Sequence, residues 1–283
     1  MVLRREPTAR QMRLAVELRR LRDAAGLAAR EAAALLGVTH PVISQIESGI
    51  AGVSEQRLRR LAAHYSCTDE EFIDALVAMA TDRTRGWWEE YRGLLPAPFL
   101  DLAELDHHSR FQYNVGILLV PGLLQTEDYA RAVYATRIPE LNQEELELRV
   151  RHRMARRVIL EGPSPVPFDA VIHEAALRIM VGTRAAARAQ LAHILELSEA
   201  DHITVRVVPF DLESFSWGAS TMAYLGGQVT KLDTVIRDAP TGAIYVDAED
   251  QLATYRARYQ KVRAMALGPE RSRDLIQRLT KEL

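Results

Sequence analysis

The sequence of 283 residues contains a single cysteine, Cys67. One thiol excludes an internal disulfide and a cysteine-rich zinc site, and this usage fits a reducing compartment. No apolar run is long enough to span a bilayer, and the first residues lack the apolar core of a signal peptide. We therefore expect a cytoplasmic protein without membrane contacts.

Sequence motifs typical of catalysis are missing too. There is no G-x-S-x-G serine elbow and no G-x-x-x-x-G-K-[ST] phosphate loop. His107 and His108 follow Asp106, but adjacent histidines on a helix point about 100° apart. His173-Glu174 lacks the second histidine of a helical zinc site. These patterns predict a protein that is not an enzyme and that uses no metal or cofactor.

Charge is spread unevenly along a chain whose length suggests two domains. Residues 1–66 hold eleven arginines against six acidic residues, a net charge of +5, whereas the whole chain has −2. Residues 67–283 therefore carry −7. A basic module on an acidic body is typical of a nucleic-acid reader, although ordinary surface arginines give the same count.

Residues 29–49, AREAAALLGVTHPVISQIESG, are the most informative stretch. They predict two short helices joined by a tight turn. Gly37 suits the left-handed conformation that ends a helix, and Thr39 is of the type that caps the next one. Ile43 and Ile46 are three residues apart and therefore share a buried stripe. This spacing is that of a DNA-binding helix-turn-helix.

The stretch resembles the Cro/phage-repressor type of helix-turn-helix, because GVTHPVISQIESG is similar to that family's GVSQSxVSxIExG. The resemblance implies a positioning helix at 30–37 and a recognition helix at 40–48. It also implies a set of DNA-binding residues, namely Arg30, Thr39, His40, Pro41, Val42, Ser44 and Gln45. Within this set, Gln45 suits a bidentate contact to adenine, Val42 suits a thymine methyl group, and Ser44 is small enough to reach a phosphate.

The same resemblance implies a structural ion pair between Arg22 and Glu47, which would fix the orientation of the recognition helix. The loop at 50–53 carries no cation and so offers few phosphate contacts. We therefore expect a homodimer that binds double-stranded DNA at a palindromic operator. The alternative is a helix-turn-helix kept only for folding or dimerisation.

Periodicity and capping residues predict an all-α helix-turn-helix domain of about five helices over residues 1–80, with caps at Thr8, Ser54 and Thr68. Residues 81–98 predict a connector that contains Trp87, Trp88 and Tyr91. These rings form either an effector or partner surface or a patch that packs the two domains together.

Residues 99–283 predict a mixed α+β domain with helices on a sheet of roughly five strands. Residues 111–120 alternate as a strand, and residues 142–162 predict one long helix. Its buried stripe would be Leu146, Val150, Met154 and Val158. Three aromatic residues either line a small-molecule pocket or belong to the core, namely Trp217, Tyr224 and Tyr245.

LVPGLLQTEDYARA at 119–132, preceded by Trp87-Trp88, resembles the WhiJ-type regulators of actinobacteria. The resemblance implies a transcriptional regulator that often acts with a small partner protein from a neighbouring gene. The sequence thus favours a sequence-specific DNA-binding regulator whose C-terminal domain senses a small ligand or a protein partner. An antitoxin-like module that holds a small protein and autoregulates its operon is the alternative, and an enzyme fused to a helix-turn-helix is the third hypothesis.

Overall fold

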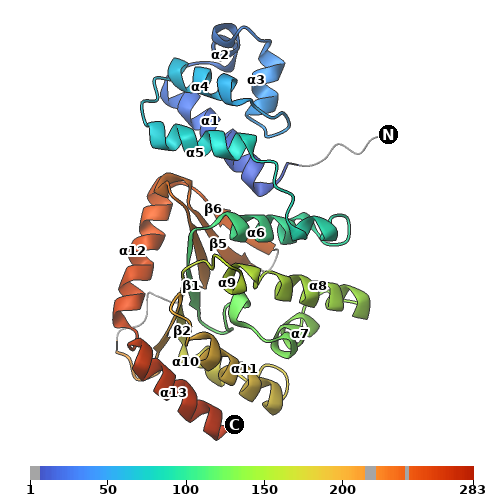
Figure 1. Ribbon diagram of the computed structural model, residues 1–283, viewed down its shortest axis with the longest axis vertical. Coiled ribbons are helices and arrows are strands. Elements are labelled where there is room, and N and C mark those ends of the chain that lie inside the picture. Colours follow the sequence, from blue (N-terminus) through green and yellow to red (C-terminus); the bar gives the residue numbers. More distant parts are fainter. Residues whose placement is uncertain (1–6, 214–220, 240–241) are drawn as a thin grey trace. The chain divides into compact units, whose positions relative to one another are not determined.

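The computed structural model describes residues 7–213, 221–239 and 242–283. The chain divides into two compact units (Figure 1). The first comprises residues 1–92 and 96–105, and the second comprises residues 93–95 and 106–283. Among the described residues, none of the helices combines the length and the apolar character needed to cross a membrane.

The first unit is built from helices, as the sequence predicts. Its helix-turn-helix part consists of α1 (Ala9–Ala24), α2 (Ala29–Leu36), α3 (His40–Ile46), α4 (Glu55–His64) and α5 (Glu70–Thr81). A 3-10 helix, η1 (Trp87–Tyr91), and most of α6 (Ala97–His108) complete the unit. The all-α, five-helix prediction is confirmed.

Capping side chains set the ends of these helices. Thr8 Oγ1 accepts a hydrogen bond from Gln11 N at 3.3 Å, and the Gln11 side chain accepts one from Thr8 N at 3.0 Å. Ser54 caps α4 as expected. The cap of α5 is Asp69, not Thr68, and its carboxylate accepts from Phe72 N. A charged carboxylate suits this position because it also faces the positive end of the helix dipole.

The acidic excess of residues 67–283 lies mainly in the first unit and not in the second. Residues 67–105, which lie almost entirely in the first unit, contain nine acidic residues and three arginines. Residues 106–283 contain 23 acidic and 22 basic residues and are close to neutral. The interpretation of the C-terminal domain as an acidic body is therefore wrong, because α5, η1 and α6 carry most of the acidic excess.

The second unit contains a six-stranded sheet, one strand more than the approximate prediction, in an α+β fold that confirms the predicted class. Its strands are β1 (Phe111–Gly116), β2 (Phe168–His173), β3 (Ile203–Val208), β4 (Met222–Gly226), β5 (Thr234–Ala239) and β6 (Gly242–Val246). Their order is β3-β2-β1-β4-β5-β6. β1, β2 and β3 are parallel, whereas β4, β5 and β6 pair antiparallel. The parallel and antiparallel parts of the sheet meet at β1.

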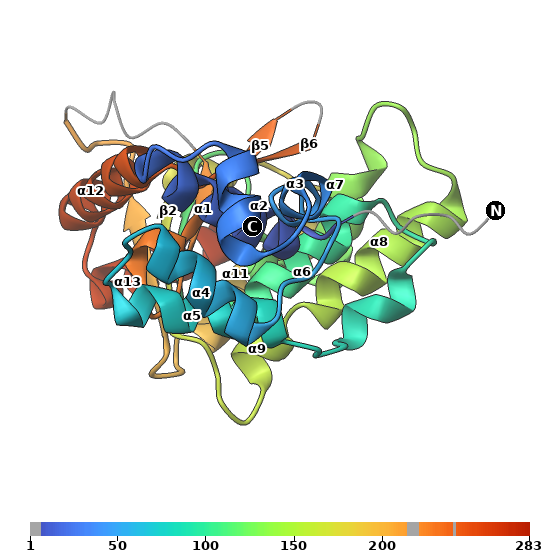
Figure 2. The same cartoon turned by 90° about the horizontal axis from the view of Figure 1, so that it is seen from above.

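Helices cover both faces of this sheet. They are α7 (Glu127–Ala135), α8 (Gln143–Ala155), α9 (Val158–Glu161), α10 (Glu174–Arg178), α11 (Arg184–Leu197), α12 (Glu249–Met265) and α13 (Pro269–Glu282), with 3-10 turns η2 (Gly122–Leu124) and η3 (Thr230–Leu232). One face packs against α11 and α13 through Ile172 and Val207. The other packs against α12, whose Tyr259 stacks on Tyr113 with ring centroids 4.4 Å apart. Figures 1 and 2 show α12 and the α7–α8 pair on opposite sides of the sheet.

Two elements end earlier than their patterns predict. β1 stops at Gly116, where a Cβ would stand 2.6 Å from the carbonyl oxygen of Leu119, because the chain turns back there. The predicted long helix breaks after Ala155 into α8 and the short α9. Val158, the last residue of the predicted stripe, is 47% exposed, while Ile159 and Leu160 enter the core. A four-residue period does not reveal such a break because the apolar residues continue through it.

Candidate nucleic-acid interface

The turn between α2 and α3 is held by backbone geometry. Gly37 has a φ of 70°, and its N–H donates to the carbonyl of Ala34. Val38 N donates to Ala33 O at 3.0 Å, which closes the turn. Ala33 is buried, so its small side chain allows α2 to pack closely against its neighbours. The local chemistry of these residues therefore fixes the angle at which α3 leaves the turn.

The recognition helix α3 divides cleanly into a buried and an exposed face. Ile43 and Ile46 are buried in the core of the unit. His40, Pro41, Ser44 and Gln45 are exposed, and Val42 is half-buried. In the described part of the chain, the side-chain polar atoms of His40 and Gln45 have no hydrogen-bond partner. This face therefore presents unused donors and acceptors to a ligand outside the chain.

The structure corrects the limits of this helix. α3 ends at Ile46, not at Ser48, and Glu47 is its C-terminal cap. Thr39 occupies the N-cap position, but its hydroxyl makes no capping hydrogen bond and is exposed. After the helix, Gly49 takes a φ of 71° and reverses the chain. Ser48 therefore lies beyond the helix, where its hydroxyl donates a hydrogen bond to the carbonyl of Gln45.

Arg22 and Glu47 tie the end of α1 to the end of α3. Arg22 Nε lies 2.7 Å from Glu47 Oε1, and Nη2 lies 2.9 Å from Oε2, so the pair is bidentate. Both side chains are nine-tenths buried. The hydrogen bond to Glu47 raises the pKa of Arg22, and burial raises the pKa of the neighbouring Tyr65 to about 12. The pair thus holds α3 in one orientation through two parallel bonds.

Arg30 lies exposed in the first turn of α2 and makes no ion pair with any described residue. The N-terminus of α2 has an alanine, Ala28, in the cap position, and the Glu31 carboxylate instead accepts from Ala28 N at 2.6 Å. Arg57 is a further candidate that the sequence reasoning missed. It lies in the first turn of α4, after the cation-free loop, and its side chain has no described partner, whereas Arg59 is held by Asp74. The arginine-rich run at 57–60 was the available signal.

Trp87, Trp88 and Tyr91 form a compact aromatic group within the first unit. The ring centroids of Trp87 and Trp88 are 6.1 Å apart and those of Trp87 and Tyr91 are 5.8 Å apart, both edge to face. Trp88 is buried, and the other two are half-buried. Residues 87–91 form η1 and lie within the first unit.

Other polar candidates of the sequence are engaged inside the second unit. Asp106 is buried, accepts from Arg156 Nε at 2.7 Å, and accepts from Gln112 at 2.9 Å. Tyr224 is buried and donates to Asp233 at 2.6 Å, while Tyr245 lies half-buried on β6. Trp217 lies outside the described residues.

Two family models match separate parts of the chain. Residues 99–278 match the family model described as Domain of unknown function (DUF5753). The chain belongs to this family. Residues 13–73 match a second model, described as Helix-turn-helix domain. In this DUF5753 protein the first unit is therefore a helix-turn-helix domain of the kind with which regulators bind DNA. No curated protein and no solved structure matches the chain.

Proposed function

We propose that the protein is a sequence-specific DNA-binding transcriptional regulator, with α3 in the major groove and the second unit as the sensor of a small ligand or a protein partner. The observation that carries the proposal is the exposed face of α3. The side chains of His40 and Gln45 have no hydrogen-bond partner among the described residues, while Arg22 and Glu47 hold the helix in one orientation. A rigid helix with free hydrogen-bonding groups is suited to reading base edges.

Within this proposal, Gln45 and His40 contact bases, and Pro41 and Val42 supply apolar contacts. Ser44, Thr39 and Arg30 contact the phosphate backbone. The test begins by selecting a preferred duplex from a random pool with the full chain. Fluorescence anisotropy then compares that operator with a scrambled duplex. Equal affinity for both duplexes would reject sequence-specific reading.

Arg30→Ala should weaken binding to the operator and to the scrambled duplex together. Arg30 is exposed and pairs with no described residue, so we expect it to contact DNA phosphates, which carry no sequence information. Its loss should flatten the dependence of log K on log salt by about one charge. Anisotropy at two salt concentrations measures both effects. Arg258→Ala, an exposed arginine on α12, is the matched control and should change neither.

We also propose that the protein binds its operator as a homodimer. One short recognition helix reads few base pairs, and the loop at 50–53 adds no cation. Two copies on a palindrome gain affinity through their linkage. Sedimentation of the full chain with and without a palindromic duplex should show two protein copies per duplex. A single copy per duplex at micromolar protein would contradict this.

The motif at 119–132 supports placing the protein near the WhiJ-type regulators, and it lies in the DUF5753 match.

A second candidate function, an antitoxin-like module that holds a small protein, is favoured by exposed apolar residues that follow the three parallel strands, namely Leu118, Leu119, Ile179, Met180 and Phe210. In the sedimentation experiment, a co-expressed small protein that adds mass would favour this alternative.

We further propose that the chain acts by binding and not by catalysis, since Asp106 is held by Arg156 and Gln112.

A further inference from the structure

A row of paired residues crosses the sheet of the second unit at its centre. Asn114 on β1 pairs with Ala170 on β2 and with Ala223 on β4. Ala223 pairs with Ile236 on β5, which pairs with Tyr245 on β6. Directly paired residues lie on one face of a sheet, so an amide, two small residues, an aliphatic group and a ring share that face. Ala223 and Tyr245 are half-exposed.

The row lies where the order of the strands reverses. β2 and β3 extend to one side of β1, and β4, β5 and β6 extend to the other. In open sheets with parallel strands, ligands commonly bind near the carboxyl ends of strands at such a point. The carboxyl end of β1 leads into η2, and this turn lies against α8: a Cβ at Gly122 would stand 3.6 Å from Arg156 Nη1 and 4.0 Å from Arg153 Nε.

Arg153 and Arg156 differ in how their charges are balanced. Arg156 is paired with the buried carboxylate of Asp106 at 2.7 Å. Arg153 instead donates to the neutral Gln125 Oε1 at 2.5 Å, and its guanidinium carbon lies 4.3 Å from the centroid of Tyr134. No carboxylate of a described residue lies within ion-pair distance of Arg153, and Asp238 acts on it only from farther away. Burial lowers the pKa of Arg153.

Two of the buried donors that lack an acceptor among the described residues belong to Arg153 and Asn114. Among the described residues, neither Arg153 Nε nor Asn114 Nδ2 has a partner, although both atoms are buried. A buried donor without an acceptor destabilises the fold, and a ligand that accepts from it removes that penalty. Gln112, two residues before Asn114 and on the same face of β1, belongs to the network of Asp106 and Arg156. Asn114 therefore lies on the same face as this polar network, and α8, which carries Arg153, covers the side of the sheet opposite α12.

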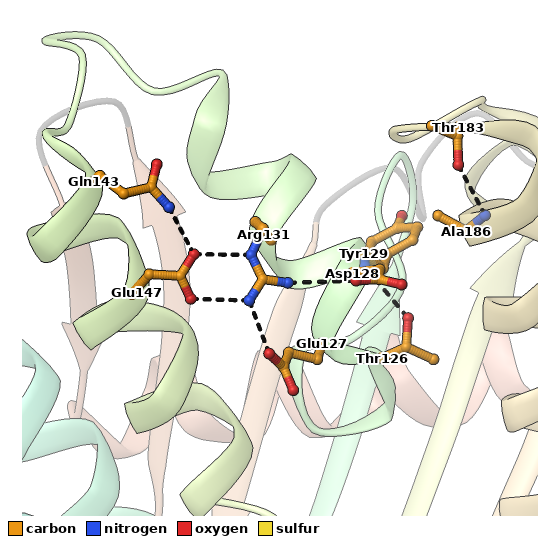
Figure 3. Close-up of polar contacts among 9 residues, drawn as sticks. All are labelled: Thr126, Glu127, Asp128, Tyr129, Arg131, Gln143, Glu147, Thr183 and Ala186. Atoms are coloured by element: carbon orange, nitrogen blue, oxygen red, sulfur yellow. Dashed lines mark hydrogen bonds and ion pairs between the residues drawn. The ribbon is translucent and has the colours of Figure 1, made fainter.

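Side-chain hydrogen bonds tie α8, the helix that carries Arg153, to α7. Figure 3 shows Arg131 of α7 between Glu147 of α8 and Glu127, with hydrogen bonds of 2.8–2.9 Å to both carboxylates. Gln143 donates to the same Glu147 carboxylate. These bonds raise the pKa of Arg131 and keep it charged. A cation presented from such a braced helix is preorganised for an anion.

We propose that Arg153, Asn114 and Gly122 form a binding site for the carboxylate of a small apolar or aromatic acid. Ala223, Ile236 and Tyr245 would contact the apolar part of that ligand. The single uncompensated charge suits a monoanion better than a phosphate dianion, and the row beyond Asn114 is apolar or aromatic. The inference rests on the proposed sensing function and specifies its ligand class. The ligand would accept from the two donors that have no partner within the chain.

Isothermal titration of the full chain with sodium benzoate tests the site, with benzamide and inorganic phosphate as comparisons. A fragment of this size that fits should bind with a Kd of about 1 mM. Benzamide, which lacks the charge, and phosphate should each bind at least about tenfold more weakly. Absence of benzoate binding at concentrations about tenfold above that Kd would overturn the proposal. Tighter binding of phosphate than of benzoate would also overturn it.

Arg153→Met removes the charge but keeps the length of the side chain. It should weaken benzoate binding by about tenfold or more. The unliganded variant should melt at the same temperature as the wild type or higher, because an uncompensated buried charge is lost. Arg151→Met, an exposed arginine on the same helix, is the matched control and should bind benzoate normally. Asn114→Leu, close in volume, should also weaken binding.

Equal binding of benzoate by the wild type and by both Arg153→Met and Asn114→Leu would place the ligand elsewhere and overturn the site. A lower melting temperature of Arg153→Met without loss of benzoate binding would show a purely structural arginine. Operator anisotropy with benzoate separates the site from the function it rests on. If benzoate binds through Arg153 and operator affinity does not change, the site is supported and the sensing role is rejected.

Discussion

Replacing Gln45 by alanine should weaken operator binding by roughly ten- to a hundred-fold, because a bidentate contact to one base contributes about 1–3 kcal/mol of discrimination. Affinity for a scrambled duplex should change little, since that affinity comes from phosphate contacts. Gln45 is exposed, its side chain has no described partner, and the burial of Ile43 and Ile46 turns it outward. Anisotropy with both duplexes at two salt concentrations measures the difference.

Gln251→Ala on α12 is the matched control, because it makes the same chemical change at an exposed position in the second unit. It should leave both affinities unchanged. Gln45→Ala would contradict the proposed orientation of α3 if it lowered the two affinities equally. The contrast with Arg30→Ala, which should lower both, separates base contacts from phosphate contacts within one domain.

Replacing Glu47 by alanine should destabilise the first unit by about 3 kcal/mol, the lower end of the range for breaking a buried ion pair. Arg22 would lose both bonds to its partner while remaining buried. It would keep its contacts with Asp23 and with the carbonyl of Leu27, which moderates the loss. Urea unfolding followed by tryptophan fluorescence measures the change in the free energy of unfolding.

The double variant Arg22→Met with Glu47→Leu should regain most of that stability, because neither buried charge is left alone. Asp74→Ala is the control, since it breaks a pair with Arg59 in which both side chains are exposed, and it should lower the free energy of unfolding far less than Glu47→Ala does. Equal losses for Glu47→Ala and Asp74→Ala would show that burial of the Arg22 pair contributes nothing. If the double variant folds but loses operator discrimination, the pair orients α3 as well as stabilising it.

The sequence predicts those features of the first unit that depend on residues a few positions apart. The turn at Gly37, the buried pair Ile43 and Ile46, and the caps at Thr8 and Ser54 all follow from such spacings. Each requires only helical periodicity and the free N–H groups of a first turn. The five-helix unit and the exposed face of α3 were therefore predictable.

The sequence predicts less of the features that depend on contacts between distant segments of the chain. The α+β class and a sheet of roughly five strands follow from alternating residues, but the pattern does not give the order β3-β2-β1-β4-β5-β6. The resemblance to repressors implied the contact of Arg22 with Glu47, 25 residues apart, whereas no local pattern contains it. The wrong expectations share a cause. Both the single helix at 142–162 and the acidic C-terminal body assume that neighbours in sequence belong together in space.

The helix-turn-helix, its capped helices and the residues that α3 turns outward follow from the amino-acid order, because those features depend on interactions within one or two helical turns. The contact of Asp106 with Arg156, 50 residues away, becomes visible only in the folded chain, as does the lack of a described carboxylate partner for Arg153. The pairing of the strands likewise puts Asn114 in line with Ala223 and Tyr245. Charge balance and strand register depend on which distant segments pack together, and no residue type encodes that alone.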